Sequence, residues 1–167
     1  MSFQYPSSSK IKDQLVDEFL QNPERFDELM ALYLNNEVDD MYGWPITHTI
    51  QKRPSLAKGW TKGMIGKLRA SNRDDTKRNL SRSFQYMDIP EADVPPLLDI
   101  AYEILNKATE KTAARVFCMT IIYNQVKVYP ELGRELLDTL TELYPMGSTG
   151  FQNRAKKIIS ALSKKIG

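Results

Sequence analysis

The feature that most constrains this chain is the recurrence of apolar residues at helical spacing. Ile11, Leu15 and Phe19 follow one another at steps of four residues, and the pattern returns in later segments down to the C-terminal end. Residues three or four apart lie on one face of an α-helix, and such an apolar face must be buried against another element. The alternating pattern typical of strands is almost absent. The sequence therefore predicts an all-α fold with strand content near zero.

Polar and proline residues mark where several helices begin. Ser9 is the expected N-cap of the first helix, and Asn22 that of the second, with Pro23 at its first position. Asn72 is the expected N-cap of a later helix, and Thr109 is expected to open a long one. These signals divide the chain into nine predicted helices.

Glycine and proline weaken two of these helices. Gly43 and Pro45 flank Trp44 inside the predicted helix of residues 36–50, so we expect it to be kinked or broken. Three glycines lie in the next helical pattern: Gly59, Gly63 and Gly66. Each costs up to about 1 kcal/mol relative to alanine. We expect them to allow close approach of a neighbouring backbone.

Most predicted helices are joined by only two to six residues, and short connections make consecutive helices antiparallel hairpins. Successive hairpins, each with an apolar face that it cannot bury alone, predict an α-solenoid formed as one domain over residues 1–167. An irregular helical bundle is the alternative. The most apolar helix, from Ala113 to Val128, is expected to be central. The predicted core of this part is Phe117, Ile121, Leu136, Leu140, Phe151 and Ile158.

Three stretches carry a resemblance to a known family. They are AARVFCM at 113–119, YPEL at 129–132 and FQNRAKKII at 151–159. Together they resemble small HEAT-like helical-repeat proteins of bacteria, in particular a Bacteroidetes-type group distantly similar in fold to DNA alkylation repair proteins. The resemblance implies a HEAT-like α–α superhelix of about four antiparallel hairpins plus a C-terminal helix. It implies no established activity, and no catalytic residue is carried over from it.

The sequence offers few residues for catalysis or metal binding. It contains one histidine, His48, and one cysteine, Cys118, in separate predicted hairpins. A Cys–His or zinc site needs several such residues together, and no phosphate-binding glycine loop or zinc-protease motif is present. Cys118 is expected to be a buried, inert thiol. We therefore expect a protein that is not an enzyme and has no cofactor or metal.

Charge is distributed unevenly, although the net charge is only +2. Residues 1–51 hold 3 basic and 9 acidic residues, whereas residues 52–82 hold 10 basic and 2 acidic residues. The basic segment contains the predicted partner-binding residues: Lys58, Lys62, Arg69, Arg73, Arg78 and Arg82. The competing interpretation is a solvated helix face that the acidic first hairpin neutralises.

These observations favour a cytoplasmic helical-repeat module that binds a protein or peptide. A single cysteine and the lack of a signal-peptide core are typical of reducing compartments, and no apolar run is long enough to cross a membrane. The alternative is a DNA- or RNA-binding protein related to the alkylation-repair group. It rests on the basic segment and the resemblance, but the acidic segments would interrupt a continuous positive field.

Overall fold

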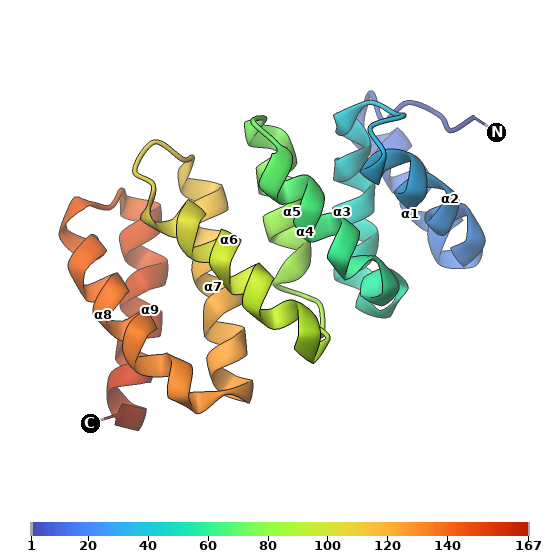
Figure 1. Ribbon diagram of the computed structural model, residues 1–167. Helices are drawn as coiled ribbons and strands as arrows, with labels where there is room; N and C mark the ends of the chain where they lie inside the picture. The colour runs from blue at the N-terminus through green and yellow to red at the C-terminus, as the bar shows by residue number, and fades with distance from the viewer. Residues whose placement is uncertain (1, 167) are drawn as a thin grey trace. The chain divides into compact units, whose positions relative to one another are not determined.

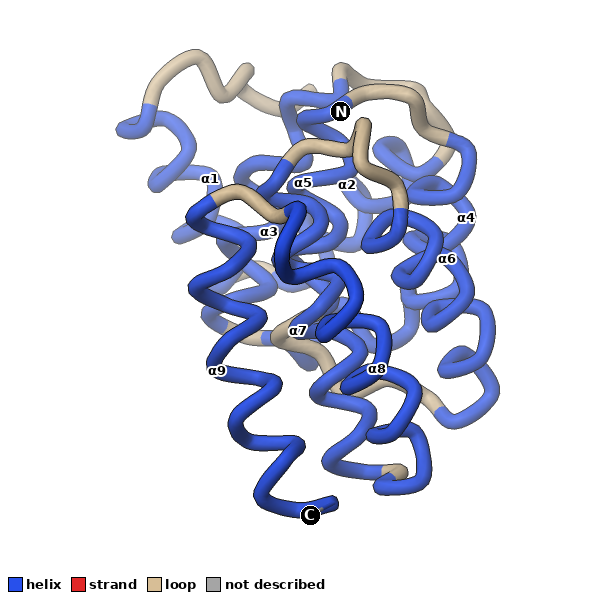
Figure 2. The backbone as a smooth tube through the Cα atoms, turned by 90° about the vertical axis from the view of Figure 1, so that its left-hand side faces the viewer, coloured by secondary structure: helices blue, strands red, loops and turns tan. Residues whose placement is uncertain are grey.

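The computed structural model describes residues 2–166, and all regular secondary structure in this range is helical. Nine α-helices and five short 3₁₀ helices are present, with no strand among the described residues (Figure 2). None of these helices is long and apolar enough to cross a membrane. The prediction of an all-α fold is confirmed.

Contacts divide the chain into two compact units, Met1–Asp93 and Val94–Gly167. The first unit contains, in chain order, α1 (Ser9–Gln21), α2 (Pro23–Leu34), η1 (Asp40–Tyr42), α3 (Gly43–Lys52), η2 (Pro54–Trp60), α4 (Thr61–Ala70), α5 (Asp74–Phe84) and η3 (Glu91–Asp93) (Figure 1). Helix α3 packs between α1 and α5, while α4 packs against α2. The odd-numbered helices therefore form one layer of this unit, and α2 and α4 belong to the other.

The helix starts follow the predicted chemistry with small shifts along the chain. Ser8, rather than Ser9, caps α1, and its Oγ accepts a hydrogen bond from the Ile11 N–H at 3.2 Å. Asn22 precedes α2, and Pro23 occupies the first helical position, where a missing N–H costs nothing. The residue at the cap of α5 is Arg73, not Asn72. The Asp75 carboxylate accepts from the Thr76 N–H at 2.8 Å, which satisfies a donor that no cap side chain reaches.

The predicted weak helix of residues 36–50 is broken before Gly43. A 3₁₀ turn, η1, comes first, and α3 then runs through Pro45, which lies in its first turn. The predicted helix that begins at Pro54 is broken in the same way. Its first seven residues, Pro54–Trp60, form the 3₁₀ helix η2, and α4 begins only at Thr61. Proline at the start of a helix removes no intrahelical hydrogen bond, so both elements tolerate it.

Only one of the three glycines in the η2–α4 segment lies close to a neighbouring helix, and it meets a side chain instead of the expected backbone. A Cβ on Gly63 would lie 2.8 Å from Leu34 Cδ1 of α2. A Cβ on Gly59 or Gly66 would meet nothing within 4 Å, so the expectation that these glycines allow close approach of a neighbouring backbone is wrong. The tightest glycine of the first unit is Gly43, where an added Cβ would lie 2.6 Å from the Tyr33 hydroxyl oxygen.

The second unit contains α6 (Val94–Asn106), α7 (Thr112–Val128), η4 (Pro130–Leu132), α8 (Gly133–Leu143), η5 (Tyr144–Met146) and α9 (Thr149–Ile166). Helices α6 and α7 pair closely, and α9 packs against both α7 and α8 (Figure 1). The long helix begins at Thr112, three residues after the predicted Thr109. Ser148 Oγ lies 3.4 Å from the Phe151 N–H, as the N-terminus of α9 requires.

Five of the six predicted core residues of this unit are buried. Leu136 and Leu140 are 0% exposed, and Phe151 is 1% exposed. Ile121 and Ile158 are also buried. Phe117 is only half-buried, so the prediction is wrong for this residue. Helix α7 is apolar around most of its circumference, so the spacing of its apolar residues does not show which side the neighbouring helices cover. They cover the side of Cys118 and Met119, not that of Phe117.

Candidate partner-binding surface

The six predicted basic residues are distributed over both layers of the first unit. Lys58 lies on η2, and Lys62 and Arg69 lie on α4. Arg73 immediately precedes α5, which carries Arg78 and Arg82. Because α4 packs against α2 and α5 packs against α3, these residues belong to different layers.

Two of these residues form ion pairs with carboxylates. Lys62 Nζ lies 3.5 Å from Asp93 Oδ1, although 83% of the lysine side chain is exposed. The Arg73 guanidinium binds the Asp75 carboxylate through Nε at 3.0 Å and Nη2 at 2.9 Å, and its Nε lies 3.4 Å from Asp40 Oδ2. Local acidic residues therefore neutralise part of the positive charge of segment 52–82.

Lys67, another cation of this segment, is buried, and its ammonium binds groups inside the unit. Its ammonium donates to the Tyr33 carbonyl oxygen at 2.8 Å and pairs with Asp40. Lys67 is not among the residues that were predicted to bind a partner. Its position, three residues after Met64 and one before Leu68, places it on the buried side of α4 and is a signal that could have identified it.

Arg82 is held against helix α3. Its Nη1 donates to Thr47 Oγ1 at 3.4 Å, and Nη2 donates to the Gln51 side-chain oxygen. The guanidinium also lies 5.6 Å from the centre of the Tyr86 ring. Arg82 therefore lies in the layer formed by α1, α3 and α5, where it hydrogen-bonds to Thr47 and Gln51 of α3.

The neighbours of Arg82 include a second cation–aromatic pair. Trp44, His48 and Lys52 are spaced by four residues along α3, so they share one side of this helix. Lys12 of α1 extends its ammonium to 5.6 Å from the Trp44 ring and pairs with Asp13 at 2.6 Å. We call Trp44, His48, Lys52 and Arg82, together with the largely buried Lys12, the His48 surface.

The pKa of His48 reflects the charges around it. Burial lowers the pKa of His48 to about 4, and the positive charges of Arg82, Lys12 and Lys52 act in the same direction. The carboxylate of Asp13 opposes them. His48 is therefore neutral at pH 7 and lies in a positive field, so the surface attracts anionic groups.

Sequence reasoning found one residue of this surface among its predicted binding residues, Arg82. The spacing of Trp44, His48 and Lys52 is readable in the sequence, but a regular helix is needed to interpret it, and Gly43 and Pro45 obscured that helix. Lys12 could not be assigned to the surface, because the packing of α1 against α3 is a tertiary contact.

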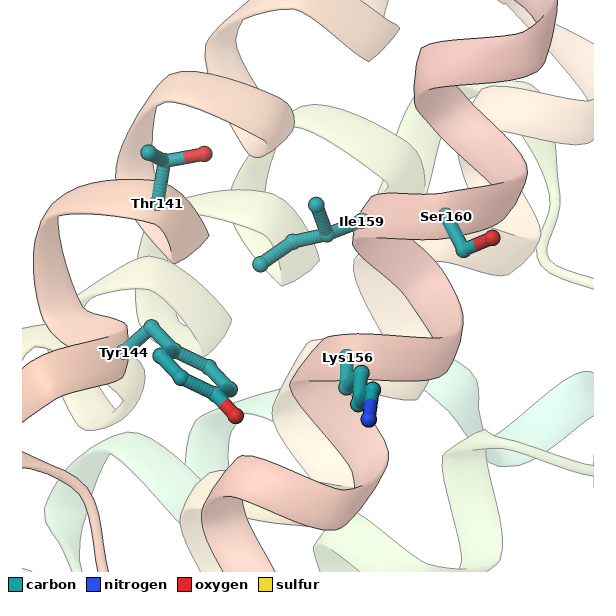
Figure 3. A pocket seen from close by; sticks show the side chains of 5 residues that line it. All are labelled: Thr141, Tyr144, Lys156, Ile159 and Ser160. Carbon is teal, nitrogen blue, oxygen red and sulfur yellow. The ribbon is translucent and has the colours of Figure 1, made fainter.

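A separate pocket of about 340 Å³ lies on the second unit, between the end of α8 and the middle of α9 (Figure 3). Tyr144 and Ile159 give it apolar walls, and Thr141, Lys156 and Ser160 add polar groups at its rim. Gln152 fixes the adjacent backbone by donating to the Tyr144 carbonyl oxygen at 2.9 Å. The pocket carries a single charged side chain and no paired acid or base.

The one histidine and the one cysteine of the chain belong to different units. His48 is on α3, whereas Cys118 is buried on α7 in the other unit. Among residues 2–166, no group of three or more histidine, cysteine, aspartate or glutamate side chains is arranged to hold a metal ion.

Comparison with known proteins identifies the family. Residues 4–162 match the family model described as HEAT repeat domain. Neither the curated proteins nor the solved structures gave a match. Because the family match covers nearly the whole chain and the fold is built of packed helices, the protein belongs to the HEAT repeat domain family.

Proposed function

We propose that the protein is a non-enzymatic binding module that recognises an acidic segment of a partner protein through the His48 surface. Helical-repeat proteins commonly use extended surfaces along stacked helices to bind partners, and the family match spans both units. This span also supports treating residues 1–167 as one HEAT-like domain. A cytoplasmic location is part of the proposal, supported by the single, buried cysteine.

The observation that carries the proposal is the positive field around His48. Arg82, Lys12 and Lys52 approach this residue from three different helices of one layer, and together they help to keep it neutral. Trp44 lies beside Lys12, and aromatic and basic residues together are typical of binding hot spots. An acidic peptide offers carboxylates to the cations and apolar side chains to the indole ring.

Nucleic acid is the second candidate. Trp44 and Tyr86 each lie 5.6 Å from a cation, and aromatic rings beside basic side chains are the platforms on which unpaired bases stack. We rank it second because carboxylates interrupt the positive surface: Asp13 pairs with Lys12, and Asp75 pairs with Arg73. A nucleic-acid site needs a more continuous positive field.

Selection from a random peptide library tests the proposal. We expect the selected peptides to be rich in aspartate and glutamate, and their affinity to fall as salt rises. Lys52→Glu should weaken binding of a selected peptide about fivefold, since the variant reverses an exposed charge at the edge of the surface.

The matched control is Lys107→Glu, which makes the same change at an exposed residue of the second unit. It should leave the affinity unchanged. Peptides without acidic enrichment, or equal affinities for the two variants, would reject the His48 surface as the site. Tighter binding of single-stranded DNA than of any selected peptide would place the second candidate first.

A further inference from the structure

A shallow pocket of about 410 Å³ lies on the other layer of the first unit, where η2 meets α2. Asp27, Leu56, Gly59 and Trp60 line it. The Trp60 indole N–H donates to Asp27 Oδ1 at 2.9 Å, which fixes the ring beside the carboxylate. An aromatic face and a carboxylate are thereby held together at one exposed place.

No cation among residues 2–166 forms an ion pair with the Asp27 carboxylate. The carboxylates of Asp13, Glu18, Glu28, Asp40, Asp75 and Asp93 each form an ion pair with a lysine or arginine, whereas Asp27 Oδ1 accepts a hydrogen bond from the neutral Trp60 indole. The hydrogen bond from Trp60 uses one carboxylate oxygen and leaves lone pairs on both oxygens for a further donor.

Space for a ligand is available beside these two groups. Gly59 has nothing within 4 Å of the position where a Cβ would lie, so the backbone leaves the floor of the pocket open. Leu56 is half-buried and gives the pocket an apolar side. The pocket therefore combines an apolar wall, an indole face and the Asp27 carboxylate.

We propose that this pocket binds the side chain of an arginine from a partner protein. A cation is attracted both by the face of an indole and by a carboxylate. Arginine suits the site better than lysine, because its planar guanidinium can stack on the ring while its N–H groups donate to Asp27. The guanidinium is also more weakly hydrated than an ammonium, which favours contact with Leu56.

This site goes beyond the proposed function, because it has the opposite charge preference and lies on different elements. The His48 surface is formed by α1, α3 and α5, whereas the arginine pocket is formed by α2 and η2. Either site can be lost without the other, so their tests are independent.

The experiment follows the Trp60 indole N–H by NMR while short blocked peptides are added to the full chain. The probes are acetyl-Gly-Arg-Gly-amide, its lysine counterpart, and a citrulline counterpart that keeps the shape of arginine without its charge. The variant Trp44→Phe identifies which of the two indole signals belongs to Trp60. We expect the arginine peptide to shift the Trp60 signal with a millimolar Kd and the citrulline peptide to bind at least about fivefold more weakly.

The decisive variant is Asp27→Asn. The amide oxygen can still accept the hydrogen bond from Trp60, so the ring stays in place while the charge is lost. We expect about fivefold weaker binding of the arginine peptide, whereas Glu37→Gln, which removes an exposed charge elsewhere in the unit, should have no effect. Equal binding of the arginine and citrulline peptides, no shift of the Trp60 signal, or an unchanged affinity in Asp27→Asn would overturn the proposal.

Discussion

Lys67 and Asp40 form an ion pair in the interior of the first unit, with Lys67 Nζ 3.0 Å from Asp40 Oδ1 and only 4% of the lysine side chain exposed. The same ammonium donates to Asn36 Oδ1 at 2.8 Å, and Asp40 Oδ2 accepts from Thr76 Oγ1 at 2.8 Å. Burial by itself would raise the pKa of Asp40, but the hydrogen bonds from Thr76 and Lys67 and the nearby cations hold it below its usual value. The pair thus ties α4, α5 and the segment after α2 together.

Lys67→Met should destabilise the protein by about 3 kcal/mol, because it leaves a partly buried carboxylate without its main cation. It also removes the donor to the Tyr33 carbonyl oxygen. Urea unfolding followed by circular dichroism measures the change. Lys58→Met, at an exposed position of η2, is the control and should stay within about 0.5 kcal/mol of the wild type. A loss below 1 kcal/mol for Lys67→Met would show that Asp40 is satisfied without it.

The pair of Lys67 and Asp40 also shows which features of the fold could be predicted from the sequence and which could not. Apolar periodicity predicted the number of helices and most of the core of the second unit, including Leu136 and Leu140. It missed Lys67, because a lysine counts as polar even where the period places it on the buried side of a helix. The 3₁₀ helices η1 and η2 were also missed, since a residue spacing of three or four does not separate the two kinds of helix near their ends.

The stability of the protein should decrease as pH falls through the titration range of His48. The folded state keeps the pKa of this histidine at about 4, mainly through burial, whereas the unfolded chain has the ordinary value near 6.5. Between these values the unfolded state binds more protons, so folding loses stability as pH falls from about 6.5 to 4. Urea unfolding at several pH values should show this slope in the wild type and a smaller one in His48→Gln. Equal slopes would contradict the lowered pKa.

Alanine substitutions at two glycines of the first unit should change the stability of the protein in opposite directions. Gly43→Ala would place a Cβ 2.6 Å from the Tyr33 hydroxyl oxygen and 3.2 Å from Asn79 Nδ2, and Tyr33 is 0% exposed. We expect a loss of about 1–3 kcal/mol, because a buried ring has little room to move. Gly66→Ala meets nothing within 4 Å inside α4 and should stabilise the protein by about 0.5–1 kcal/mol. Thermal unfolding of both variants checks the signs, and a stable Gly43→Ala protein would show that the Tyr33 ring can shift.

In the second unit, Phe151 should matter more for stability than Phe117. Phe151 is 1% exposed, and the Arg115 guanidinium lies 4.6 Å from the centre of its ring. Phe151→Ala should therefore cost about 3–5 kcal/mol. Phe117 is half-buried, and Phe117→Ala should cost about 1–2 kcal/mol, in proportion to the smaller area that it buries. Denaturant unfolding of the two variants compares them directly, and the reverse order would show that the side of α7 carrying Phe117 is central to the core.

For the candidate site, sequence reasoning located the basic segment but not the arrangement of its side chains. The charge of residues 52–82 is a property of composition, whereas the pairing of Arg73 with Asp75 and of Lys62 with Asp93 depends on side-chain positions. The contribution of Lys12 to the His48 surface depends on the packing of α1 against α3. Such contacts between distant segments have no signature in a single sequence.

Duplex DNA should bind no tighter than about 10⁻⁶ M at physiological salt, as expected for a basic surface without a dedicated site. If all six predicted residues contacted phosphates, the log–log dependence of the binding constant on salt would have a slope of about −5. We expect a slope shallower than about −3, because Lys62 and Arg73 are paired with carboxylates and Arg82 is bound to α3. Fluorescence anisotropy over a range of salt concentrations measures both quantities. Nanomolar affinity that Lys62→Glu combined with Arg69→Glu abolishes, with the circular dichroism spectrum unchanged, would instead make nucleic acid the partner of this protein.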